Sequence, residues 1–225
     1  MKFKALFAVS PVGVLGTICA GMLNSSLNGM GAVFAKEIGL SIVEVTTFMA
    51  AAILGGMLLQ FPIGHLSDKF DRRTVLILTS ASAALAASGV IWATGQSVAI
   101  LFFSATIYGA ICYTIFPLST SQVNDLAPPD KLVQVSAGLI IAYGIGASIG
   151  PTLAAQAMGA FGPKGLFYFL IWINVILVTV TTIRIIQRDR GAKEKAPFMP
   201  LGGHGVSSKQ LYTVAISSDE GDKPN

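Results

Sequence analysis

Long apolar segments without charge dominate the chain and alternate with short polar segments. Asp, Glu, Lys and Arg are absent from residues 5–35, 74–124, 132–163 and 165–183. A hydrocarbon core about 30 Å thick requires roughly 20 apolar residues per helix, so each run is close to or above that length. The run 74–124 is too long for one crossing at a rise of about 1.5 Å per residue. We expect it to turn back at Thr94-Gly95-Gln96.

This pattern predicts an all-α membrane protein with six transmembrane helices. Backbone groups in lipid must be hydrogen-bonded within their own segment, which favours helices over strands. Pro128-Pro129 interrupts the chain before the fifth helix, and Asp130 is placed to cap that helix. Further turn residues lie between 159 and 163. The predicted spans cover about residues 11–34, 43–64, 74–94, 98–122, 131–158 and 165–186.

The composition agrees with a membrane protein. Hydrophobic residues make up 53% of the chain and charged residues 12%, and the mean hydropathy is +0.70, which is too apolar for a soluble domain. The net charge of +4 does not indicate a nucleic-acid partner, because the basic residues stand at the ends of the apolar runs. We therefore expect the lipid bilayer as the main partner. Cys19 and Cys112 lie inside apolar runs and predict no disulfide.

The distribution of basic residues predicts the orientation. Of the 15 Lys and Arg residues, only Lys36 and Lys164 fall on the side of the membrane opposite to the amino terminus. Such an asymmetry follows the positive-inside pattern, so both termini are expected in the cytoplasm and the protein in the inner membrane. Residues 1–188 would form the helical domain. The segment 189–225 is rich in Gly, Ser, Lys and Asp, and we expect a disordered tail there.

One polar segment carries a recognisable motif between the second and third predicted spans. It reads Gly64-His65-Leu66-Ser67-Asp68-Lys69-Phe70-Asp71-Arg72-Arg73. This segment resembles the signature G-x-L-x-D-[RK]-x-G-[RK]-[RK] of major facilitator superfamily transporters, in which it follows the second helix of each six-helix half. Matching positions are Gly64, Leu66, Asp68, Lys69, Arg72 and Arg73. Asp71 stands where the family has Gly, at a turn where a left-handed conformation would favour glycine.

The resemblance implies a gating loop in which Asp68 acts as a latch carboxylate and Arg72 as its basic partner. The alternative is that the basic residues Lys69, Arg72 and Arg73 only set the membrane topology. In the fifth predicted span, Gly144, Gly146, Gly150 and Pro151 resemble the glycine and proline pattern of the fifth helix of a family half. Small residues at this spacing let helices approach closely in lipid.

The resemblance covers about residues 5–188. This part of the chain is similar to the carboxy-terminal half of the bacterial YcaD-like group. A full member of the family has twelve helices in two six-helix halves. The chain would then be a fragment or half of a permease, and its expected partner is a second six-helix half. The resemblance implies transport of small solutes by alternating access, without a cofactor. The alternative is a non-transporting membrane subunit that pairs with another membrane chain.

Candidate substrate-cavity residues are the polar side chains expected at mid-membrane depth. Asn24 and Asn28 stand one helical turn apart in the first span and are the first choice. Tyr113, Tyr143 and Asn174 complete the set. Each can equally be an interhelical hydrogen-bond partner worth about 1 kcal/mol. Gln60 and Gln122 lie nearer the cytoplasmic ends and are weaker candidates.

An enzyme is the competing class, because Gly146-Ala147-Ser148 resembles the serine motif of rhomboid proteases. That chemistry needs a general base beside the nucleophile. The only histidines are His65, in a predicted loop, and His204, in the tail, so we predict no catalytic site. Clustered His, Cys and carboxylate ligands for a metal are also missing from the sequence. No ionisable residue is expected at mid-membrane, so a coupling carboxylate is not predicted in this chain.

Overall fold

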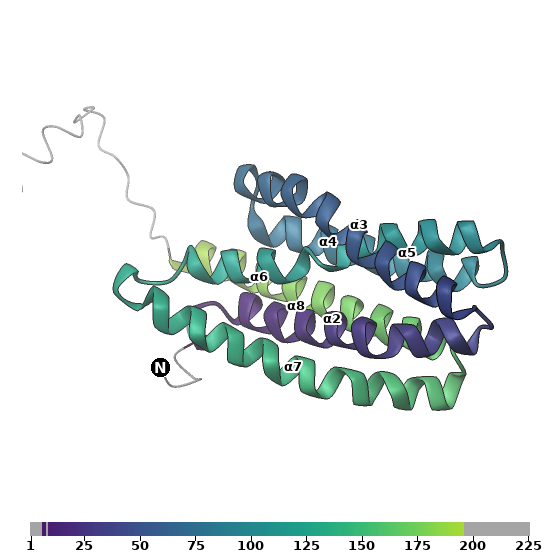
Figure 1. Ribbon diagram of the computed structural model, residues 1–225. Helices are drawn as coiled ribbons and strands as arrows, with labels where there is room; N and C mark the ends of the chain where they lie inside the picture. The colour runs from purple at the N-terminus through teal and green to yellow at the C-terminus, as the bar shows by residue number, and fades with distance from the viewer. Residues whose placement is uncertain (1–5, 8, 196–225) are drawn as a thin grey trace, which may run out of the picture. The chain divides into compact units, whose positions relative to one another are not determined.

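A computed structural model describes residues 6–7 and 9–195, with side chains described as far as residue 187. The described part is helical, and residues up to Gln187 form one compact unit (Figure 1). The unit contains the following elements: α2 (Pro11–Glu37), α3 (Ile42–Lys69), α4 (Arg72–Ala93), α5 (Val98–Cys112), α6 (Ile115–Asn124), the 3-10 turn η1 (Pro129–Lys131), α7 (Leu132–Phe161) and the first part of α8 (Gly165–Lys195).

Five helical segments of the described chain are long and apolar enough to cross a membrane. They are Ile42–Lys69, Arg72–Ala93, Val98–Asn124, Pro129–Phe161 and Gly165–Gln187. The first predicted span corresponds to α2, which has 27 residues but is not among these five. Asn24, Asn28 and the serines between them lower its hydropathy. The structure therefore supports an all-helical membrane protein, whereas the count of six spans stays a prediction.

Side-chain caps fix the starts of several helices. Ser10 accepts a hydrogen bond from the backbone of Gly13 at the start of α2. Ser41 and Glu44 form a reciprocal capping box at the start of α3. Asp71 begins α4 by accepting from the Thr74 backbone N–H at 3.3 Å. Each of these caps satisfies a backbone donor that the first helical turn leaves unpaired.

Two details of the predicted turns are wrong. The φ angle of Asp71 is −57°, so the turn that ends the family motif is not left-handed, and aspartate fits there as a helix cap. Asp130 does not cap the fifth predicted helix. It lies within η1, and α7 begins only at Leu132, with no side-chain hydrogen bond at its cap. The two prolines direct the chain into a 3-10 turn before the helix starts.

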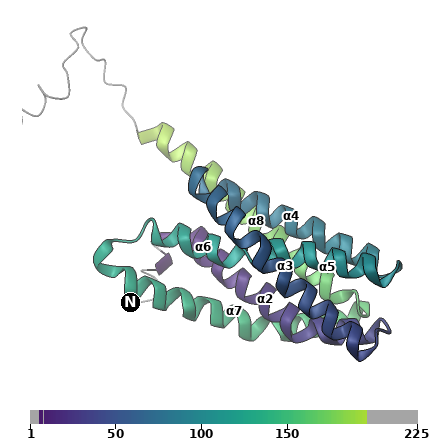
Figure 2. The same cartoon turned by 45° about the horizontal axis from the view of Figure 1, so that its top comes forward.

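Helix α2 runs alongside α7, and their backbones touch through glycines (Figures 1 and 2). A Cβ atom at Gly146 would collide with the carbonyl of Ile18, and one at Gly150 would lie 2.7 Å from the carbonyl of Met22. From the other side, a Cβ at Gly21 would collide with the carbonyl of Tyr143. Gly144 differs, because nothing lies within 4 Å of a Cβ built there. The close approach thus follows one face of α7.

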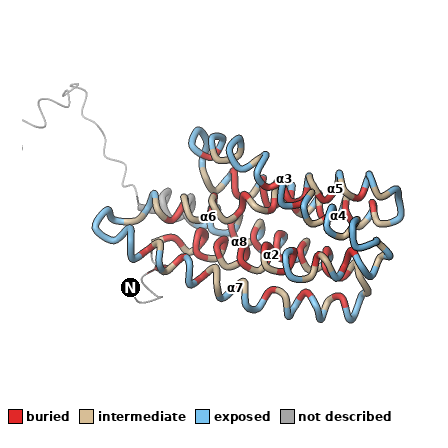
Figure 3. The backbone as a smooth tube through the Cα atoms, viewed as in Figure 1, coloured by how far each residue is buried: buried red, intermediate tan, exposed pale blue. Residues whose placement is uncertain are grey.

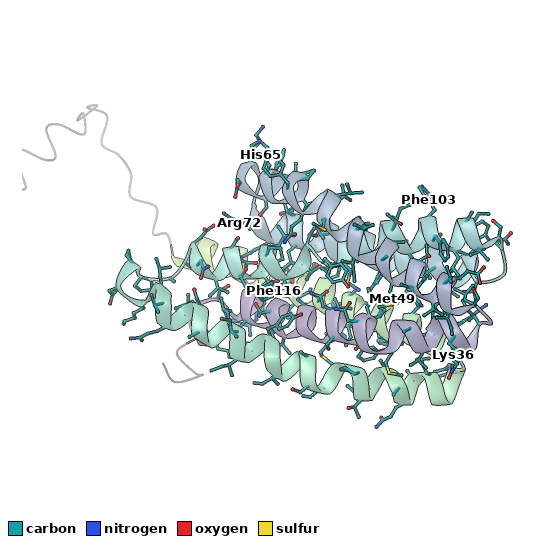
Figure 4. The ribbon with its side chains drawn as sticks, viewed as in Figure 1. Lys36, Met49, His65, Arg72, Phe103 and Phe116 are labelled. Carbon is teal, nitrogen blue, oxygen red and sulfur yellow. The ribbon has the colours of Figure 1, made fainter. Side chains whose placement is uncertain are left out.

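Helices α3 and α5 form a second closely packed pair. A Cβ at Gly55 would collide with the carbonyl of Thr106, and one at Gly109 with the carbonyl of Ala52. The opposite end of α3, around His65, rises away from the bundle in Figure 4. Helix α3 accordingly contacts α6 far less than it contacts α5. A gap between α3 and α6 results, and it holds the cavities described below.

The core lies between the helices and is mainly aliphatic and aromatic (Figure 3). Phe34 of α2 packs edge-on against Phe167 of α8 at a centroid distance of 4.9 Å. Tyr108 of α5 contacts the same ring at 5.6 Å. All three side chains are fully buried. Phe167 therefore joins α8 to both α2 and α5.

The fourth predicted span, 98–122, is interrupted in the structure. Helix α5 ends at Cys112 and α6 begins at Ile115, with Tyr113 and Thr114 between them. Pro117 explains the break, since proline has no N–H with which to bond the carbonyl four residues earlier. Within the break, the Thr114 hydroxyl donates to the carbonyl of Ile111 at 2.6 Å. The two helices together still have the length of one span.

The predicted end of the helical domain at residue 188 stays a prediction, and the compact unit of the structure ends at Gln187. Helix α8 continues to Lys195, beyond the expected domain end at residue 188. Residues 196–225, which make up most of the predicted disordered tail, lie outside the described residues.

Candidate functional site

Arg72 is the centre of a polar network at the α3–α4 turn (Figure 4). Its Nη2 atom donates to Asp68 Oδ1 at 3.0 Å, and Asp68 lies four residues earlier, near the end of α3. Its Nε atom donates to Asp125 Oδ2, at the end of α6. Its Nη1 atom also donates to Ser67 Oγ at 3.3 Å. One guanidinium group thereby joins the α3–α4 turn to α6, in a geometry that only arginine provides.

Asp125 is the partner that the motif did not reveal. It is the first charged residue after the uncharged run 74–124. Two predicted spans fit into that run, so the chain must return to the membrane side on which the motif lies. From the sequence, this placement indicates on which side of the membrane Asp125 lies, but it does not indicate which residue Asp125 contacts.

The remaining motif positions are arranged around this network. Gly64 lines a small cavity next to Asp68 and Arg72. Leu66 and Lys69 are exposed, and Arg73 is half-buried. Among the described side chains, neither Lys69 nor Arg73 forms an ion pair, in contrast to Arg72.

The small cavity has a volume of about 140 Å³ and separates α3 from α6. Its lining combines the network with residues of both helices: Gln60, Gly64, Ser67, Asp68, Arg72, Thr114, Pro117, Leu118 and Ser121. Asp68 and Asp125 expose 62% and 53% of their side chains, whereas Arg72 exposes 23%. Ion pairs as exposed as these contribute only about 0–1 kcal/mol to stability. The network is therefore too exposed to be a major source of stability.

A larger cavity of about 260 Å³ adjoins the small one, and Gln60 and Pro117 line both. Its lining also includes Asn24 of α2, Tyr113 of the helix break and Phe116 of α6, together with Ile53, Gly56 and Met57 of α3. Two of the predicted cavity residues, Asn24 and Tyr113, thus lie at one hollow.

The other predicted cavity residues occupy different positions. Asn28 is exposed, and its Oδ1 atom accepts a hydrogen bond from the Tyr113 hydroxyl at 2.6 Å. Tyr143 packs edge-on against Phe116 at a centroid distance of 4.8 Å. Asn174 is fully buried in α8, and its amide donates to the carbonyl of Leu170 in the same helix at 2.8 Å. Asn28 and Tyr143 therefore contact cavity residues, whereas Asn174 is not part of the lining of either cavity.

The family model of the Major Facilitator Superfamily matches residues 13–217, which is most of the chain. The chain belongs to the Major Facilitator Superfamily. The predicted family membership is confirmed, and with it a multi-pass membrane protein. Assignment to the carboxy-terminal half of a family member stays a prediction.

Named relatives within this superfamily are bacterial. The chain is 31% identical over 174 residues to the uncharacterized MFS-type transporter YfkF of Bacillus subtilis, covering 74% of the chain and 44% of the relative. It is 28% identical over 182 residues to the uncharacterized MFS-type transporter YcaD of Escherichia fergusonii, covering 81% of the chain and 44% of the relative. The chain thus spans less than half the length of these relatives.

Proposed function

We propose that this superfamily member is one six-helix half of a transporter that moves a small solute across the inner membrane by alternating access. The observation that carries the proposal is the position of the Arg72 network. It joins the end of α3 to α6 directly beside two connected hollows. An exposed ion pair that adds little stability but bridges the helices beside these hollows supports a gating role.

In this proposal, the larger cavity contributes to the substrate site. Asn24, Asn28, Tyr113 and Tyr143 belong to it directly or through the contacts described above. The polar side chains are amides and phenols, which bind solutes through hydrogen bonds. Asn174 is excluded from this group, because its amide is buried and bonded within α8.

The gating loop acts as a latch on the end of α3. Asp68 and Asp125 hold Arg72 in the conformation described here, and the small cavity between α3 and α6 opens further when these contacts break. A contact present in only one conformation shifts the equilibrium by its differential free energy. About 1.4 kcal/mol is enough for a tenfold change in population.

A second six-helix body completes the transporter by packing against α3 and α7. In the most apolar 18-residue stretch of each of these two spans, 22% is buried inside the protein. The corresponding share is 39–44% in the other three candidate spans. Phe61 and Leu58 of α3 are 83% and 69% exposed. In this arrangement both termini face the cytoplasm, and Asp68, Arg72 and Asp125 lie at the cytoplasmic surface.

The proposal is tested with Asp68→Asn, compared with Asp71→Asn as a matched control. Asp71 directly precedes Arg72 in the chain, but among the described side chains its carboxylate accepts hydrogen bonds from Thr74 and forms no ion pair with Arg72. Asparagine caps helices as well as aspartate does. A cysteine replacing Met57 reports on access to the larger cavity. The protein is coexpressed with a six-helix partner, and an impermeant thiol reagent is applied to cells and to inverted vesicles.

Alternating access predicts that this cysteine reacts from both sides. Asp68→Asn should raise its reactivity from the cytoplasmic side about tenfold, and Asp71→Asn should not. Reactivity from neither side, or an equal effect of both substitutions, would favour a non-transporting subunit.

A further inference from the structure

The larger cavity has a consistent chemical character. Its lining consists of Asn24, Ile53, Gly56, Met57, Gln60, Tyr113, Phe116 and Pro117, and none of these side chains carries a charge at neutral pH. Two charged groups, Asp68 and Arg72, line the neighbouring small cavity and bind each other. A ligand in the larger cavity would therefore meet amides, aromatic rings and a backbone without a fixed charge.

Asn24 presents a hydrogen-bond donor to this cavity. The side chain is only 6% exposed, and its Oδ1 atom accepts the Cys112 thiol at 3.8 Å. Its Nδ2 atom has no hydrogen-bond partner among the described residues, yet it is not one of the atoms sealed inside the protein. Asn24 lines the cavity, so its amide N–H groups are an unpaired donor of that lining. A donor with so little contact with solvent is poorly solvated, and a ligand acceptor would satisfy it.

The helix break supplies a matching acceptor. Pro117 has no N–H for the carbonyl of Tyr113, and no other hydrogen bond to this carbonyl is found in the described part of the chain. Tyr113 and Pro117 both line the larger cavity. The free carbonyl therefore belongs to a residue of the cavity lining. Broken helices that present backbone groups to a solute are a recurring feature of membrane transporters.

Aromatic rings form the third part of the site. Phe116, which is labelled in Figure 4, lines the cavity. The ring of Tyr143 packs edge-on against it. The Tyr113 ring is held by its hydroxyl, which donates to Asn28. Two rings fixed in this way offer surfaces against which a flat solute can pack with little loss of conformational freedom.

We infer that this site takes neutral, planar solutes that carry both a hydrogen-bond donor and an acceptor, as an aromatic carboxamide does. The inference rests on the proposed transport function and names its substrate class. The carboxamide oxygen would accept from Asn24 Nδ2, and the carboxamide N–H would donate to the Tyr113 carbonyl. A carboxylate would meet that carbonyl with the wrong charge, and an ammonium group would meet the Asn24 donor. Neither charge would find a counter-ion in the lining.

Three probes of nearly equal size test this class: benzamide, benzoate and benzylammonium. Thermal unfolding of the protein, purified in detergent, is followed with a thiol-reactive dye, because Cys19 and Cys112 are both buried in the folded state. Benzamide should raise the unfolding midpoint with a half-saturating concentration about tenfold lower than that of either charged probe. A charged probe that binds as well as benzamide would overturn the inference, and so would stabilisation by none of the three.

Two substitutions of Asn24 connect the effect to the site. Asn24→Leu should raise the half-saturating concentration of benzamide about tenfold, whereas Thr106→Val, whose hydroxyl bonds only its own helix, should not change it. Asn24→Asp should shift the preference at least about tenfold toward benzylammonium, which keeps the test valid if the leucine variant folds poorly. Equal probe preferences in Asn24→Asp and the unmodified protein would overturn the assignment.

The accessibility experiment on Asp68 uses no solute. Normal alternating access without benzamide binding would therefore reject the substrate class alone. Loss of alternating access would reject the transporter proposal.

Discussion

Arg72 bonds to two carboxylates that belong to different helices. Asp68 belongs to the same turn of the chain, whereas Asp125 is 53 residues away. Of these two contacts, only the one with Asp125 links α6 to the α3–α4 turn. If the latch restrains α3 relative to α6, the more distant carboxylate should matter at least as much as the one in the motif.

We predict that Asp125→Asn changes access to the cavity as strongly as Asp68→Asn does, by about tenfold. The free energy of unfolding should fall by no more than about 1 kcal/mol, because the pair is exposed. The two quantities are measured by alkylation of a cysteine at Met57 and by thermal unfolding. A loss of stability without any change in alkylation would indicate a purely structural ion pair.

The contribution of the hydrogen bond between Tyr113 and Asn28 can be measured by substituting both partners. A double-mutant cycle with Tyr113→Phe and Asn28→Ala should give a coupling energy of about 0.6 kcal/mol, which is typical of hydrogen bonds inside membranes. Each single variant should fold, since Asn28 is exposed and can be solvated again. Tyr113→Phe combined with Thr179→Val, in α8, provides the control and should show no coupling. A value near zero for Tyr113 and Asn28 would argue that this contact does not hold the ring.

At the scale of elements, the contact between α2 and α7 depends on which glycine faces which backbone. Gly144 and Gly146 lie in the same helix, but only Gly146 has no space for a Cβ. We predict that Gly146→Ala destabilises the protein by about 1–3 kcal/mol through overpacking. Gly144→Ala should leave stability unchanged or raise it by up to about 1 kcal/mol, because alanine favours helices. Thermal unfolding of both variants compares them directly, and equal losses would contradict the packing described here.

The sequence predicted the helical elements well where charge marks the membrane edge. Charged and turn residues separate α2, α3, α4, α7 and α8 near the expected positions. The break between α5 and α6 was missed, although Pro117 is visible in the sequence, because proline inside a helix can bend it or interrupt it. The start of α7 was misplaced, because two prolines formed a 3-10 turn that capping rules do not anticipate.

The site was predictable only in part, since sequence distance hides contacts between helices. Asn24 and Asn28 share a helix and a polar character, which local spacing reveals. Their partners Cys112 and Tyr113 lie 88 and 85 residues away, and no periodicity connects them. Asn174 illustrates the reverse case, because an asparagine in an apolar run can bond its own helix as easily as it can face a cavity.

At the scale of the whole molecule, burial and orientation are linked. Large apolar side chains are exposed along α3 and α7, among them Phe61 and Val133 at 83% and 85%. Such surfaces are stable only against lipid or another apolar body. Both α3 and α7 must then lie within the bilayer, which leaves the turns at their ends as the points where the chain meets water.

The orientation itself can be tested at these turns. Lys36 lies in the last turn of α2, Lys164 lies between α7 and α8, and Arg73 lies in the first turn of α4. We predict that cysteines at Lys36 and Lys164 react with an impermeant thiol reagent applied to intact cells. A cysteine at Arg73 should react only in inverted vesicles. The native thiols give little background, because Cys19 and Cys112 are buried. The 15 basic residues favour this orientation. The opposite labelling pattern would place the Arg72 network on the outer surface, where it would have to act as an outer gate.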